Sequence, residues 1–183
     1  MTDQQMWENA VHVVMAEYEA LAGPVKARVA RIGESIRQIK LEIFSLAEQS
    51  AAIETCATCA GLCCEKGKYH FSVIDLLVYL STGRELFTPS FRETPCPFLG
   101  ERGCLMDPAY RPFPCITFHC ELLESPLSAV ELERMYLLER SLRASCRQME
   151  ELFGNRLMQG LLLSYERFLA GADAAILSGV GGR

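Results

Sequence analysis

Eight of the nine cysteines in the chain lie between residues 56 and 120, and four of them fall within the stretch CATCAGLCC. A C-x2-C step lets two thiolates from one turn reach the same ion, and later cysteines can complete a tetrahedral site or an iron-sulfur cluster. The candidate ligands of a metal or cluster are Cys56, Cys59, Cys63, Cys64, Cys96, Cys104, Cys115 and Cys120. Thiolates suit both zinc and iron, so the ligand type alone does not choose the metal.

Other roles for the sulfur and imidazole groups are open. Cys146 stands alone in a helical stretch and is expected to be a small buried hydrophobic residue. A catalytic cysteine would need a histidine partner, and His70 and His119 lie within the cysteine-rich region. We expect His119 in an outer hydrogen-bonding role, because eight thiolates already fill two four-coordinate sites. The sequence does not decide whether the protein is an enzyme.

Composition favours one globular domain in a reducing compartment. Half of the 183 residues are hydrophobic, and the net charge of −5 gives no broad attraction to nucleic acid or to an anionic membrane. The first ten residues lack the features of a signal peptide, and no apolar run reaches the length of a membrane span. We therefore expect a cytoplasmic protein, in which nine thiols indicate metal or redox chemistry rather than disulfides.

Two helices are predicted before the cysteines. Thr2 and Gln5 can form a capping box at the start of the first helix, and Gly23-Pro24 ends it. The second helix carries a heptad seam made of Val25, Val29, Ile32, Ile36, Ile39, Ile43 and Leu46.

Charges beside this seam favour a helical hairpin over a homodimeric coiled coil. The basic residues beside the seam are Lys26, Arg28 and Lys40, and the acidic residues of the first helix are Asp3, Glu8, Glu17 and Glu19. Folding the first helix back antiparallel on the second would pair acid with base.

More helices are predicted after the first cysteines. Residues 72–82 are predicted to form a short helix. Ser125-Pro126 is predicted to start a long helix, which Gly154 and Asn155 interrupt before the last helix begins. Residues 84–120 contain six prolines and match neither a helix nor a run of strands. A metal can replace the hydrophobic core that such a loop lacks.

These patterns predict a mainly α fold: a helical bundle with an irregular cysteine-rich metal-binding insert between the second and later helices. The expected parts of the single domain, 1–183, are a helical hairpin (1–54), the cysteine-cluster metal-binding region (55–121), C-terminal helices (122–172) and a flexible tail (173–183). We expect an unknown protein partner, neither nucleic acid nor membrane as partner, and a monomer or weak homodimer.

The motif CATCAGLCC, then CPFL with Cys104 shortly after, then RPFPC, resembles the CxxCxxCC cysteine-cluster family (YkgJ-like), described as a zinc- or iron-chelating domain. The order and the intervening lengths are similar over residues 56–120, although three residues rather than two precede the Cys63-Cys64 doublet. The resemblance implies metal or iron-sulfur binding by the cysteines from Cys56 to Cys115. A similar cluster attached to a flagellin lysine methylase implies an accessory role in protein modification.

Two functions remain open at this point. In the first, the cysteines hold an iron-sulfur cluster, with 4Fe-4S favoured, and the protein transfers electrons or assists a modifying enzyme. In the second, they hold a structural zinc and the helices form a protein-interaction surface. We favour the first, because eight thiolates exceed what one structural zinc needs.

Overall fold

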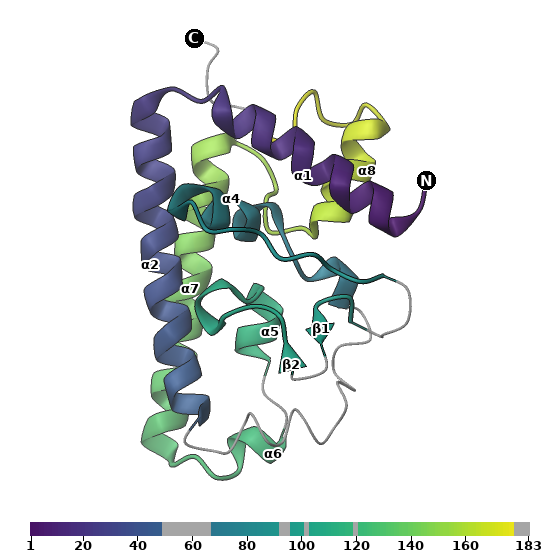
Figure 1. The fold of residues 1–183 in the computed structure, drawn as a ribbon. Helices are drawn as coiled ribbons and strands as arrows, with labels where there is room; N and C mark the ends of the chain where they lie inside the picture. The colour runs from purple at the N-terminus through teal and green to yellow at the C-terminus, as the bar shows by residue number, and fades with distance from the viewer. Residues whose placement is uncertain (49–66, 92–95, 101–102, 119–120, 178–183) are drawn as a thin grey trace.

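Two long antiparallel helices, α2 (Gly23–Glu48) and α7 (Ala129–Phe153), form one side of the molecule (Figure 1). The computed structural model describes residues 1–48, 67–91, 96–100, 103–118 and 121–177. Ser35 of α2 lies beside Ser145 of α7, and Glu42 pairs with Arg134 near the other end of the helices. The apolar seam of α2 therefore packs within the chain, as expected, but its long partner is α7.

The first helix, α1 (Asp3–Glu19), begins at the expected capping box between Thr2 and Gln5. It packs on α4 (Val73–Thr82) and α8 (Leu161–Leu169) rather than along α2 (Figure 1). The predicted hairpin of the first two helices is therefore wrong. Lys26 Nζ donates a hydrogen bond to the carbonyl of Glu19 at 2.7 Å across the connection between α1 and α2. The apolar face of α1 packs against α4 and α8.

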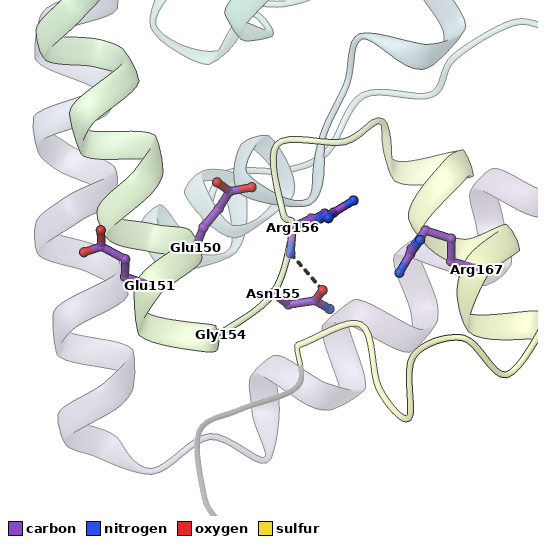
Figure 2. Close-up of a pocket in the computed structure, with 6 residues that line it drawn as sticks. All are labelled: Glu150, Glu151, Gly154, Asn155, Arg156 and Arg167. Atoms are coloured by element: carbon purple, nitrogen blue, oxygen red, sulfur yellow. Dashed lines mark hydrogen bonds between the residues drawn. The ribbon is translucent and has the colours of Figure 1, made fainter.

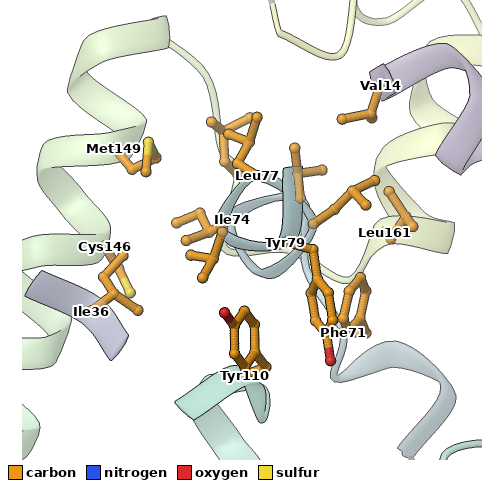
Figure 3. Packing of buried hydrophobic residues seen from close by; sticks show 14 of the residues in the cluster. Val14, Ile36, Phe71, Ile74, Leu77, Tyr79, Tyr110, Cys146, Met149 and Leu161 are labelled. Atoms are coloured by element: carbon orange, nitrogen blue, oxygen red, sulfur yellow. The ribbon is translucent and has the colours of Figure 1, made fainter. Parts of the chain in front are cut away.

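Helix α4 is the buried centre of the fold. Ser72 and Asp75 form its capping box, and Gly83 ends it in the left-handed conformation with φ 63°, which glycine adopts without a Cβ penalty. Figure 3 shows Ile74 and Leu77 of α4 in a cluster of buried side chains drawn from several helices. The short helix predicted at 72–82 is confirmed.

Short elements lie before α4 and between α4 and α7, and they include a hairpin of two-residue strands that the sequence did not predict. They are η2 (Gly67–Tyr69) before α4, then β1 (Leu99–Gly100), β2 (Gly103–Cys104), η3 (Pro108–Tyr110), α5 (Phe113–Thr117) and α6 (Glu121–Glu124). Phe87 and Phe98 lie 5.8 and 5.6 Å from the Trp7 ring. The described part of this region therefore has an aromatic core, contrary to the expectation that it lacks one.

The C-terminal part differs from expectation in two places. Helix α7 starts at Ser128, whose side chain caps the Glu131 N–H, rather than at Ser125. Residues 173–177 do not behave as the expected flexible tail: Ile176 and Leu177 are buried, and their N–H groups donate to the Glu17 carboxylate. The described residues form a mainly helical structure in which no helix combines the length and apolar character needed to cross a membrane.

Candidate metal centre

A single short turn, Gly67–His70, lies between two of the candidate ligands. The sequence places this turn three residues after Cys64, and the η2 helix makes it compact through a hydrogen bond from His70 N–H to the Gly67 carbonyl at 3.0 Å. Cys96 lies against its first residue and Cys115 against its last. The turn therefore approaches two of the described cysteines at once.

Cys96 is buried against the backbone of Gly67. A Cβ added to Gly67 would lie 2.7 Å from Cys96 Sγ, a separation that ordinary side chains do not show. The sulfur can sit this close only because residue 67 has no side chain. Gly67 is therefore part of the candidate centre, although glycine offers no ligand and no sequence motif marks this position.

Cys104 lies on strand β2, and the hairpin brings it near Cys96. Cys96 accepts a hydrogen bond from the Leu99 N–H in a turn, and Leu99 pairs with Cys104 across the hairpin. The geometry of a β-turn and an antiparallel pair limits the Cα atoms of Cys96 and Cys104 to about 12 Å apart. Cys104 is exposed whereas Cys96 is buried.

Cys115 contacts an imidazole. His70 Nδ1 lies 3.3 Å from Cys115 Sγ, and both side chains are half-buried. Burial lowers the pKa of His70, so the ring is neutral at neutral pH, with one nitrogen free to donate and the other to accept.

The remaining candidate ligands, Cys56, Cys59, Cys63, Cys64 and Cys120, lie outside the described residues, as does His119. Among the residues that the structure describes, no three histidine, cysteine or acidic side chains are grouped closely enough to hold a metal ion. The turn contacts Cys96 and Cys115, but the described residues by themselves do not form a complete set of metal ligands. By donor chemistry, the three described thiols fit a soft metal ion or an iron-sulfur cluster.

Contacts at both ends of the turn hold it against the helices. Lys68 forms an ion pair with Asp3 at 2.7 Å, which ties the turn to the start of α1. A Cβ at Gly160 would collide with the Tyr69 carbonyl, so the turn and the start of α8 also pack backbone against backbone. The Leu161 N–H then donates to the Phe71 carbonyl at 2.6 Å.

A buried ion pair fixes the helix that follows the turn. Lys40 Nζ donates to Asp75 Oδ1 at 2.8 Å, and their side chains are 1% and 3% exposed. Asp75 Oδ2 accepts from the N–H and the hydroxyl of Ser72. The predicted pairing of the basic residues beside the seam with the acidic first helix is wrong for Lys40, which pairs with Asp75 of α4. An acid inside the apolar run SVIDLLVYL was the signal that a buried cation should oppose it.

Cys146 is buried in the protein interior near the Lys40–Asp75 pair, and its thiol is unreactive. It is buried, as expected, and burial raises the pKa of its thiol to about 12, against the opposing effect of the Lys40 ammonium. A thiol with this pKa stays protonated at neutral pH and is a poor nucleophile and metal ligand.

Arginine side chains from α2, from α7 and from the residue after the C-cap of α4 hold the segment that carries Cys115. The Arg37 and Arg84 guanidinium groups lie 5.0 and 4.5 Å from the Tyr110 ring centroid. Arg143 of α7 lies 4.7 Å from the ring of Phe113, two residues before Cys115. Such cation–π contacts help to hold an irregular segment in one position.

A cavity of about 570 Å³ at the C-terminal end of α7 is lined by charged and polar residues and by none of the candidate cysteines (Figure 2). Its lining residues are Glu150, Glu151, Gly154, Asn155, Arg156 and Arg167. Asn155 donates to the Ile176 carbonyl, and Arg167 binds Asp173 through two hydrogen bonds at 3.0 and 3.1 Å. These groups hold the C-terminal segment in place, and the lining contains no thiol.

The described geometry thus adds Gly67, the His70–Cys115 contact and the Lys40–Asp75 pair to the residues that the cysteine spacing identified. Comparisons of this chain with protein-family models, with curated proteins and with solved structures find no match.

Proposed function

We propose that this protein binds a metal through its clustered cysteines, that the metal is an iron-sulfur cluster with 4Fe-4S favoured, and that it acts in electron transfer or as an accessory to a modifying enzyme. The observation that carries the proposal is the Gly67–His70 turn, which contacts Cys96 at one end and Cys115 at the other. The turn thereby brings together residues that are 29 positions apart (Gly67 and Cys96) and 45 positions apart (His70 and Cys115) in the chain.

Chain connectivity supports adding the earlier cysteines to this place. Cys64 precedes Gly67 by three residues, and three residues of fully extended chain span at most about 11 Å. Cys63 is one residue beyond. In sequence, the Cys63-Cys64 doublet therefore directly precedes the turn that contacts Cys96 and Cys115.

The residues that would hold the cluster or metal are the eight cysteines from Cys56 to Cys120. When bound, an iron-sulfur cluster supplies one-electron transfer. The chain's own contribution is to fix the ligands: the aromatic core positions the hairpin of Cys96 and Cys104, and the arginine contacts position the segment of Cys115. We place the protein in the cytoplasm, because thiols stay reduced there.

A structural zinc with a protein-interaction surface is the second candidate. The observation that favours it is the exposure of apolar side chains on the long helix, where Val130 is 77% and Leu137 is 50% exposed. Residues seven apart on a helix share one face. Phe118, at the end of the short helix of Cys115, is also exposed.

Elemental analysis of the protein isolated without oxygen tests both candidates. Iron and acid-labile sulfide in equal amounts are expected for the favoured cluster. Zinc without sulfide would support the structural site instead. Protein that holds neither iron nor zinc after anaerobic isolation would contradict both.

A further inference from the structure

The contact between His70 and Cys115 joins an imidazole to a proposed metal ligand. His70 comes from the turn before α4 and Cys115 from α5, and the two residues are 45 positions apart. Their side chains meet at 3.3 Å in a half-buried place, next to Phe71, which is fully buried. A hydrogen bond is electrostatically stronger in such surroundings than in water.

We propose that His70 is a positioning residue of the metal centre: its Nδ1–H donates a hydrogen bond to the sulfur of metal-bound Cys115. This inference rests on the proposed function, because it requires Cys115 to be a ligand. Hydrogen bonds from outer residues to ligating sulfurs orient the ligands and tune metal affinity and cluster potential.

The donor role fits the geometry better than direct ligation by His70. Among the described residues no third ligand-type side chain joins the pair. The chain also offers seven other candidate thiols from which a complete set can be drawn without imidazole.

Three substitutions of His70 distinguish a hydrogen-bond donor from a side chain that contributes only packing. Asn places an amide nitrogen where Nδ1 of histidine lies, whereas Gln places it near the position of Nε2, and Leu offers no donor. His12 on α1 is exposed and provides the matched control, His12→Leu.

The experiment measures metal content and metal affinity by competition with a chelator, with helical circular dichroism as the check on folding. We expect His70→Leu and His70→Gln to keep the wild-type metal content but to bind it roughly 10- to 100-fold more weakly, the range typical of lost outer hydrogen bonds. His70→Asn should recover most of the affinity, and His12→Leu should match the wild type.

Three results would overturn the inference. Wild-type affinity in His70→Leu means that the contact has no role, and loss of affinity in His70→Asn equal to that in His70→Leu means that the ring only fills space. Loss of bound metal in His70→Leu to the level of Cys115→Ala means that His70 is itself a ligand. Failure of the proposed function is distinct, because either the wild type would then hold neither iron nor zinc, or Cys115→Ala would retain full metal content and affinity.

Discussion

The buried pair of Lys40 and Asp75 allows the sharpest test of how the helices hold the candidate centre. Lys40→Met replaces the ammonium with an apolar side chain of similar length and leaves the Asp75 carboxylate without its cation. Removing one partner of a buried pair costs about 3–5 kcal/mol, because an uncompensated charge remains in the interior. We therefore expect the free energy of unfolding of Lys40→Met to fall by about that amount, and Asp75→Asn to lose a similar amount.

The double variant distinguishes a lost charge partner from lost packing. Lys40→Met with Asp75→Asn removes both charges and keeps an oxygen that can accept from Ser72. Replacement of a whole buried pair by neutral groups is often close to neutral, so we expect the double variant to be more stable than either single variant. This reversal is the signature of an ion pair in a low-dielectric interior.

Urea unfolding followed by circular dichroism measures these differences, with every protein at the same metal content. Arg134→Met is the matched control, because it breaks an ion pair with Glu42 whose side chains are 62% and 51% exposed. It should cost less than about 1 kcal/mol. A Lys40→Met protein as stable as this control, or a double variant that loses the sum of the two single losses, would refute the reasoning.

Two further predictions concern the sulfur environment. Gly67→Ala should reduce the free energy of unfolding by about 1–3 kcal/mol in urea titrations, because the new Cβ would displace Cys96, whereas Gly23→Ala, with nothing within 4 Å of its Cβ, should not be destabilised. Cys146 should resist iodoacetamide in the native metal-free protein from pH 7 to 9, since burial holds the pKa of its thiol at about 12 and the reactive thiolate forms only as pH approaches that value. Exposed Cys104 should react, and equal labelling of the two, read by mass spectrometry, would contradict the burial of Cys146.

Periodicity and capping chemistry were enough to find most helices. The capping box at Thr2 lies where the sequence predicted it, because a cap depends on residues three apart. The partner of α2 was predicted wrongly, since a heptad seam specifies that a helix packs but not on what. Opposite charges on the first two helices favoured the hairpin. The apolar face of α1 instead packs in the aromatic core, through Trp7.

The candidate centre could be predicted by residue type but not by geometry. Spacing identified Cys96, Cys104 and Cys115, and the structure adds that a turn links two of them. Gly67 could not be found, because the requirement for a missing Cβ comes from a sulfur 29 positions later in the chain. The pairing of His70 with Cys115 was likewise hidden, since contacts across 45 residues leave no local pattern.

Metal content in single cysteine variants tests the central claim most directly. Cys96→Ala, Cys104→Ala and Cys115→Ala remove proposed ligands, and Cys146→Ala removes a buried thiol of the core as the matched control. After identical anaerobic isolation, each of the first three should hold less iron or zinc than the wild type, while Cys146→Ala should hold the wild-type amount. Wild-type metal content in all three ligand variants, or an equal loss in Cys146→Ala, would contradict the claim that these clustered thiols form a metal centre.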